Sequence, residues 1–396
     1  MHRGAKIAAL AVLWIVPMFL FSLAFTSDWP TFWNGVLVPS WKGPFMDLMS
    51  ISSALKVQRA NSDPLIANPA DVYQRPMNYP RIWLHLFERL HVNDRNLWIV
   101  GISFCVIYLI SISWLVGRSE SNLEVLALLI AALSLAPLLA MERGNTDMPV
   151  FALVLLGCAA GNKYVKPAAY FCAALLKVFP FVAFLIDGAR GTWKERRLSV
   201  AFAAAALLLL LSQWRDLGAI RQSTPVSTYL SYGLLSLKAQ TVYMSGGVFA
   251  ASCLAAMVIV IVAWLTRPKF EDSVLSSESG NLFLLFGGIY AFTFAIGSNW
   301  NYRLIFLLPT LPFAMKLARN TKYAKWALAY IATLLVAENS FALGTYQGIP
   351  LGDIATFTLF AMLVAAFLPW MLQILSDIRK VFGAPTNAVI SDQRAR

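Results

Sequence analysis

The sequence reads GPFMDLMS from Gly43 to Ser50, within a polar stretch that runs from Phe25 to Leu97 between the first two hydrophobic segments. Membrane-spanning helices are usually joined by short turns, so a connection of about seventy residues needs a reason. The stretch is not composed like a disordered linker, because aromatic residues are spread among its charges. We therefore predict that residues 26–96 form a folded loop over the membrane and contain amphipathic helices.

Composition indicates a membrane protein. Of the 396 residues, 59% are hydrophobic and 13% are charged, whereas soluble domains carry about 25% charged residues. The net charge of +12 is interpreted as a topology signal, since Lys and Arg collect on the cytoplasmic side of membranes, and not as a sign of nucleic-acid binding. The four cysteines all lie in apolar runs, which predicts free thiols.

Apolar segments of suitable length predict an all-α polytopic fold with about ten to eleven transmembrane helices plus a re-entrant or broken segment. The clear spans are 7–25, 97–116, 123–141, 198–212, 241–266, 281–297, 303–318, 325–343 and 352–375. The first is expected to be an uncleaved helix. Residues 1–375 are expected to form a single membrane domain, followed by a loose cytoplasmic tail at 376–396.

Charge placement fixes the expected topology. If 167–187 crossed the membrane fully, the basic run from Arg190 to Arg197 would lie outside. We therefore expect this segment to enter the membrane and return, with a break near Lys177–Pro180, which is possible where protein or a water-filled cavity surrounds the backbone. Both termini are then cytoplasmic. The loop 26–96 and the segments 142–147, 213–240, 298–302 and 344–352 then share the outer face.

Asp47 is the first candidate for chemistry. It opens a run with helical character, so its carboxylate either caps that helix or serves as a general base at the mouth of a cavity. Two further residues of the loop, Tyr79 and Arg81, precede a second amphipathic helix. Arg81 suits either a phosphate or a lipid headgroup, and Tyr79 suits an aromatic belt.

Other candidates lie close to the membrane in the outer segments. Glu142 and Arg143 either pair with each other or, with Gly144 and Asn145, approach an anionic ligand. Lys177 lies inside an apolar run, where a charge is costly, so it either extends to a headgroup or faces a partner or phosphate. The segment Asn299-Trp300-Asn301-Tyr302-Arg303 suits a sugar and phosphate site, or an interfacial anchor.

Metal and nucleophile patterns are missing from the sequence. The three histidines, His2, His85 and His91, are scattered, and no carboxylate-rich metal motif or phosphate-binding glycine loop is present. We therefore expect no cofactor, and a divalent metal would have no evident ligand cluster.

The long first loop with an early carboxylate resembles the C-type glycosyltransferase fold (GT-C). The pieces Asn78-Tyr79-Pro80-Arg81, Arg143-Gly144-Asn145, Lys177-Val178-Phe179-Pro180 and Asn299-Trp300-Asn301-Tyr302-Arg303-Leu304 resemble, in order, those of glycosyltransferase family 87. Its members are mannosyltransferase-like proteins that use polyprenyl-phosphate-linked sugars. The chain has Arg81 where members often have a second proline, and Arg143 in a variant Gly-Gln-x-Asn motif. These departures leave the sugar and the acceptor open.

The resemblance implies a role for each candidate. Asp47 would be the general base of an inverting transfer of a mannose-like or other sugar to a glycan or glycolipid acceptor. Arg143, Lys177 and Arg303 would hold the donor phosphate. The residues around the sugar and acceptor would be Tyr79, Arg81, Glu142, Asn145, Asn299, Asn301 and Tyr302.

The expected location is the inner membrane of a bacterium, with the active site on the periplasmic face and membrane lipids as surroundings. The alternative is a transporter or a lipid-linked glycan flippase, which also has broken helices and intramembrane charge. No internal repeat is evident, and the polar groups gather at one surface, which favours the enzyme. The sequence does not indicate an oligomeric state.

Overall fold

The computed structural model describes residues 2–227, 230–242, 245–340, 345–346 and 349–382. Most of the tail expected at 376–396, and residues 344 and 347–348 of the outer loop expected at 344–352, fall outside the described residues. The described chain is almost entirely helical, and the elements in order are α1 (His2–Thr26), α2 (Trp29–Gly35), α3 (Met46–Arg59), α4 (Ile82–Arg89), α5 (Leu97–Arg118), α6 (Asn122–Ala132), α7 (Leu135–Arg143), α8 (Asp147–Ala159), α9 (Val165–Leu176), η1 (Phe179–Phe181), α10 (Val182–Arg190), α11 (Trp193–Ser212), α12 (Trp214–Ser223), β1 (Ser231–Tyr232), α13 (Leu234–Thr241), α14 (Gly246–Leu265), α15 (Asp272–Leu275), α16 (Glu278–Ile296), β2 (Asn299–Trp300), η2 (Asn301–Thr310), α17 (Leu311–Ala318), α18 (Ala324–Glu338), β3 (Thr345–Tyr346), β4 (Ile349–Pro350) and α19 (Leu351–Phe382).

The helices define an all-α polytopic membrane protein. In the described residues, α1, α5, α14, α16 and α19 contain stretches long and apolar enough to span a bilayer. The bent pairs α6–α7 (47°) and α11–α12 (74°) bring the total to seven if each pair counts as one span. This is fewer than the ten to eleven expected, because the predicted spans at 303–318 and 325–343 fold as shorter pieces. A 3-10 helix, η2, precedes the short α17, and α18 has 15 residues.

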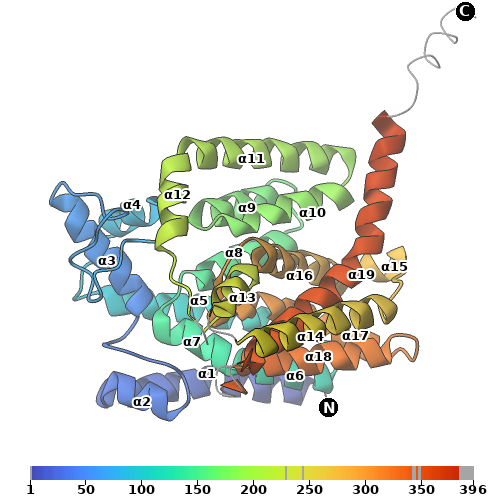
Figure 1. Ribbon diagram of the computed structural model, residues 1–396, viewed down its shortest axis with the longest axis horizontal. Coiled ribbons are helices and arrows are strands. Elements are labelled where there is room, and N and C mark those ends of the chain that lie inside the picture. Colours follow the sequence, from blue (N-terminus) through green and yellow to red (C-terminus); the bar gives the residue numbers. More distant parts are fainter. Residues whose placement is uncertain (1, 228–229, 243–244, 341–344, 347–348, 383–396) are drawn as a thin grey trace, which may run out of the picture.

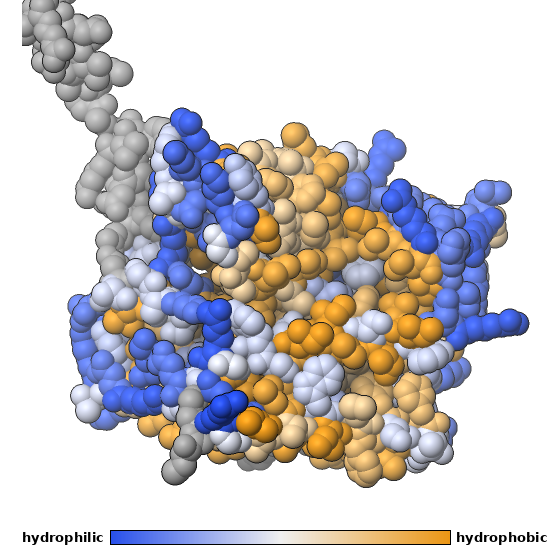
Figure 2. Space-filling view, turned by 180° about the vertical axis from the view of Figure 1, so that it is seen from behind, coloured by the Kyte–Doolittle hydropathy of each residue, from blue (hydrophilic) through white to orange (hydrophobic). Residues whose placement is uncertain are grey.

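The long helices lie roughly side by side along the horizontal axis of Figure 1, with α2, α3 and α4 at the left end and the N-terminus at the right. Figure 2 shows a hydrophobic surface between hydrophilic side chains at the two ends. The helix α14 leaves most of its apolar residues exposed, as expected of a helix that faces lipid. These features fit a belt that lipid covers.

Basic residues gather at the end away from α3. Their contacts link the ends of several helices: Lys6 Nζ donates to the Gly117 carbonyl at 2.8 Å, Arg118 pairs with Glu278 at 2.6 Å, Arg190 Nη2 donates to the Leu275 carbonyl at 2.8 Å, and Lys322 pairs with Glu271 at 3.2 Å. We call this the basic end. Lys6, Arg190 and Lys322 belong to basic segments that the charge rule assigns to one side of the membrane, and they lie together at this end.

Residues 167–187 form a helical hairpin, the shape expected of a segment that enters the membrane and returns. The chain runs along α9, becomes extended at Lys177 (φ −152°, ψ 135°), turns through η1 and continues in α10. The two helices are antiparallel, since Lys166 near the start of α9 pairs with Asp187 near the end of α10 at 2.9 Å. The hairpin therefore starts and finishes at the basic end and places Lys177 at its tip.

Short helices set the depth of the hairpin tip. The helices α8 and α9 have 13 and 12 residues, so at 1.5 Å per residue each is about 20 Å long. A bilayer core is about 30 Å thick. Because both helices begin or end at the basic end, Asp147 and Lys177 lie short of the opposite surface of the belt. The loop 26–96, with α2, α3 and α4, lies on that side.

Candidate functional site

The start of α3 is held against the end of α7, and this contact positions Asp47. Phe45 precedes α3 in the left-handed region (φ 57°), and its backbone N–H donates to the Glu142 carbonyl at 3.1 Å. Gly144 ends α7 with φ +57°, and a Cβ there would lie 2.9 Å from Leu48 and 3.0 Å from Phe45. Glycine is required here both for the backbone conformation and for the close approach.

Asp47 lies half-buried in the first turn of α3, as the sequence predicts. Its carboxylate accepts a hydrogen bond from the side-chain amide of Asn145, which follows α7. The loop 26–96 and the 142–147 segment therefore meet at Asp47 and Asn145, two of the residues singled out from the sequence.

Glu142 and Arg143 are paired beneath this contact. Glu142 is fully buried, and its Oε1 accepts from Trp29 Nε1 at 3.1 Å and from Ser40 Oγ at 2.6 Å. Its Oε2 lies 3.1 Å from Arg143 Nε. A buried ion pair of this kind is stable only when further hydrogen bonds satisfy its atoms, and Trp29 and Ser40 supply them.

Aromatic rings hold the guanidinium of Arg143. Its centre lies 3.9 Å from the Trp41 ring and 5.7 Å from the Trp300 ring, and the side chain is 2% exposed. Within the described residues, its Nη2 has no hydrogen-bond partner. The rings position this cation by cation–π attraction and leave a donor for a ligand.

A second buried cluster is centred on Asp147. Lys177 Nζ lies 2.7 Å from Asp147 Oδ1, and Arg303 Nε lies 3.1 Å from Oδ2. Arg303 also donates to Asn299 Oδ1 through Nη1. Lys177 is therefore a buried, partnered charge, and it does not extend to a headgroup.

Backbone pairing fixes the 299–303 segment beside this cluster. Antiparallel β1 and β2 pair Tyr232 with Asn299 and Ser231 with Trp300. The Asn301 N–H donates to the Leu230 carbonyl at 2.9 Å, and Asn299 Nδ2 donates to the Thr293 carbonyl at 2.7 Å. The Asn299 side chain and the Asn301 backbone N–H therefore make hydrogen bonds that hold the segment in place. Trp300 and Tyr302 of the same segment point toward the site.

A cavity of about 30 Å³ lies between α3, α7 and η2. Its lining residues are Asp47, Ser50, Arg75, Pro76, Asn78, Tyr79, Arg143, Ser223, Pro225, Trp300 and Tyr302. The structure thus brings together Asp47, Arg143, Tyr79 and Tyr302 of the residues predicted from the sequence. A cavity of this size holds one or two water molecules.

The remaining predicted site residues lie around the cavity and do not line it. Glu142, Asn145, Lys177, Arg303, Asn299 and Asn301 take part in the contacts described above. Arg81 is held between two carboxylates, with Nη2 2.8 Å from Asp63 Oδ2 and Nε 2.8 Å from Asp216 Oδ2. Arg81 therefore joins the 26–96 loop to α12.

Seven of the eleven residues that line the cavity were not predicted as site residues, and Arg75 and Pro225 are two of them. Arg75 lines it from the loop that follows α3, and Pro225 lines it from the chain after α12. A lone arginine between Gln74 and Pro76 follows no pattern that marks a binding residue. Only its place in the fold reveals it.

Several residues of the loop 26–96 have shifted pKa values, and those of Tyr79 and Asp71 bear on the site. Burial, together with the negative charge of Asp47, raises the pKa of Tyr79 well above its ordinary value. Tyr79 therefore remains a neutral hydroxyl that can donate a hydrogen bond. It is 5% exposed, so it packs inside the protein and does not belong to a lipid-facing aromatic belt. At Asp71, burial opposes ionisation, but hydrogen bonds from Arg75 and the Tyr73 N–H lower the pKa below its ordinary value.

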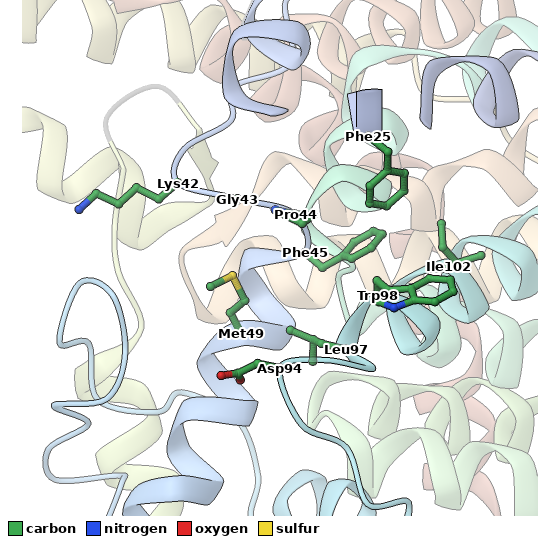
Figure 3. A pocket seen from close by; sticks show the side chains of 10 residues that line it. All are labelled: Phe25, Lys42, Gly43, Pro44, Phe45, Met49, Asp94, Leu97, Trp98 and Ile102. Carbon is green, nitrogen blue, oxygen red and sulfur yellow. The ribbon is translucent and has the colours of Figure 1, made fainter. Parts of the chain in front are cut away.

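A larger apolar groove of about 720 Å³ lies beside the cavity. Phe45, which precedes α3, and Met49 of α3 line the groove, whereas Asp47 and Ser50 of α3 line the cavity. In Figure 3, Phe25, Phe45 and Trp98 lie close together and Lys42 points away from them. The groove opens where α1 ends and α5 begins, at the edge of the apolar belt.

In the described part of the chain, no group of three or more His, Cys, Asp or Glu side chains lies in an arrangement that could hold a metal ion. Asp47, Glu142 and Asp147 are instead partnered by Asn145 and by the cations described above.

Comparison with known proteins adds no assignment: no protein-family model, no curated protein and no solved structure matches this chain. The fold and site define an all-α membrane protein with a buried, charged site beneath its first long loop. The resemblance to glycosyltransferase family 87 stays a prediction.

Proposed function

We propose that this protein is a membrane glycosyltransferase that moves a sugar from a polyprenyl-phosphate donor to a glycan or glycolipid acceptor. The observation that carries the proposal is the shared cavity of Asp47 and Arg143. It supplies one carboxylate for a proton and one cation for a leaving phosphate, which are the groups that this transfer needs.

The proposed reaction is a single displacement with inversion. The acceptor hydroxyl oxygen attacks the anomeric carbon while its proton passes to Asp47. The bond between the anomeric carbon and the phosphate oxygen breaks, and its electron pair leaves with the lipid phosphate. Arg143 stabilises the developing charge, and the Lys177–Asp147–Arg303 cluster adds positive charge behind it.

The apolar groove supports a lipid-linked substrate. It shares a turn of α3 with the cavity, so an apolar chain in the groove would keep its polar end close to Asp47. We place the site on the face opposite the basic end. By the charge rule this is the periplasmic face of a bacterial inner membrane, with the N-terminus cytoplasmic.

The test is a transfer assay on the purified protein in lipid vesicles. It is given a panel of polyprenyl-phosphate sugars and scored for release of polyprenyl phosphate. Asp47→Asn should abolish release while the protein stays inserted and folded. Glu88→Gln, an exposed carboxylate on α4, is the matched control and should retain activity.

A transporter or lipid flippase is the alternative, and the same variant separates the two. In a flippase, no covalent step depends on Asp47, so Asp47→Asn would leave lipid flipping measurable in vesicles. No internal repeat is evident in the sequence, which favours the enzyme, since transporters are usually built from such repeats.

A further inference from the structure

Arg75 reaches the same cavity as Asp47 and Arg143 from a different part of the chain. Its side chain is 32% exposed, and it follows α3 in the first external loop. Arg143 comes from the end of α7. Within the described residues, these two arginines are the cations that line the cavity.

A buried carboxylate orients Arg75. Its Nε and Nη2 donate to the two oxygens of Asp71 at 3.0 and 2.9 Å, and the Asp71 side chain is 2% exposed. Two parallel hydrogen bonds fix the plane of a guanidinium. The third nitrogen of the Arg75 guanidinium, Nη1, therefore lies on the side away from Asp71.

The other cations of the site do not line the cavity, and each of them contacts a carboxylate. Lys177 and Arg303 both contact the fully buried Asp147, and Arg81 is shared by Asp63 and Asp216. Arg143 retains an unpartnered Nη2 in the described structure. Arg75 and Arg143 are therefore the pair best placed to receive an oxyanion beside Asp47.

We propose that Arg75 and Arg143 form a clamp for the phosphate of a polyprenyl-phosphate ligand, with Asp71 as the residue that positions Arg75. The inference rests on the proposed function and names the group that this site recognises. Guanidinium groups bind phosphate through paired donors. Lys177 and Arg303 then pair with Asp147 and are not part of the clamp.

The experiment measures binding, so it does not depend on turnover. Purified protein in detergent is titrated with polyprenyl phosphate and, separately, with the uncharged polyprenol, and the ligand-induced rise in melting temperature is recorded. The wild type should bind the phosphate more tightly than the alcohol. Arg75→Gln and Arg143→Gln should each weaken phosphate binding roughly ten- to hundredfold and leave polyprenol binding unchanged.

Two further variants make the outcome decisive. Arg75→Lys keeps the charge but not the planar fork, and should lie between the wild type and Arg75→Gln. Arg59→Gln, an exposed arginine at the end of α3, should bind like the wild type. If Arg75→Gln melts early without ligand, Arg75→Lys decides the test.

The failures are distinguishable. Equal binding of phosphate and alcohol by the wild type would remove the phosphate donor from the proposed function, and the clamp with it. A wild type that prefers the phosphate, with Arg75→Gln and Arg75→Lys unchanged, would overturn the clamp and leave the proposed function standing. Equally tight binding of phosphatidylglycerol at Arg75 would mark a general headgroup site and overturn the assignment to the polyprenyl ligand.

Discussion

Gly144 is the residue whose backbone decides whether the site can form. Its positive φ and the short distances from its virtual Cβ to Leu48 and Phe45 mean that any side chain strains the chain and separates α7 from α3. Gly144→Ala should therefore lower stability by about 1–3 kcal/mol and reduce sugar transfer.

The measurement is the melting temperature of purified protein in detergent. Gly161→Ala is the control, because a Cβ at Gly161 meets nothing within 4 Å. Equal melting temperatures for Gly144→Ala and the wild type would show that the close packing of α7 on α3 is not what holds Asp47.

The Asp71–Arg75 pair predicts a pH dependence of stability. The pKa of Asp71 is lowered in the folded protein, so its contribution is present above the unfolded pKa of about 3.9 and is lost as pH falls through the folded value. Asp71→Asn should have a lower melting temperature than the wild type at neutral pH, and the difference between the two melting temperatures should disappear in acid. A difference that stays constant from pH 7 to acid would contradict the ion pair.

Sequence reasoning reached individual residues where local chemistry is distinctive. Asp47 follows a Gly-Pro pair at a helix start, and Lys177 interrupts an apolar run, so each attracts attention alone. The partner of Lys177 was not predictable, because Asp147 reaches it only through the pairing of α8 with α9. Arg75 was missed for the same reason: its importance comes from tertiary structure.

At the scale of elements, the break between α6 and α7 is held by the end of α18. Ser134 Oγ donates to Glu338 Oε2 at 2.7 Å, and the Leu135 N–H donates to Asn339 Oδ1 at 3.3 Å. These bonds satisfy polar groups that a helix break exposes. Since α7 ends at Arg143, α18 helps to set the direction in which the site residues are presented.

Glu338→Ala should therefore destabilise the protein by about 1–3 kcal/mol, because it removes the hydrogen bond with Ser134 and leaves a cavity at a fully buried position. Glu338→Gln keeps an acceptor oxygen and should lose less. Thermal melting of the two variants checks this order. A Glu338→Ala protein as stable as Glu338→Gln would show that the side-chain bond does not maintain the break.

The hairpin formed by α9 and α10 was predictable at this scale, and the break-up of the predicted span at 303–318 was not. Charge balance predicts that 167–187 reverses direction, and α9 and α10 are antiparallel. The 303–318 segment has a uniform apolar pattern but contains Pro309 and Pro312, which lack backbone donors. Its first part is therefore a 3-10 helix, η2, and not a regular span.

For the whole molecule, apolar composition and basic clusters predicted the all-α membrane fold and the common end of the basic residues. The number of spans was overestimated, because apolar runs such as 325–343 indicate burial as well as lipid contact. Tyr330 and Leu334 of α18, for example, are fully buried among other helices. Hydropathy alone does not separate these two environments.

The orientation in the membrane makes a separate prediction. In a background in which the native cysteines are replaced by serine, Ser62→Cys and Lys163→Cys place exposed thiols at opposite ends of the molecule. A membrane-impermeant thiol reagent added to intact bacterial cells made permeable only at the outer membrane should label Ser62→Cys and spare Lys163→Cys. The reverse pattern would invert the proposed topology and put the site on the cytosolic side.

The most direct test of the central claim is the amount of polyprenyl phosphate released from a polyprenyl-phosphate sugar by the wild type and by Asp47→Asn under identical conditions. We expect release by the wild type and a loss of at least about a hundredfold in the variant, the scale of a missing general base, with an unchanged melting temperature. Undiminished release by a folded Asp47→Asn protein would contradict the assignment of Asp47 as the base.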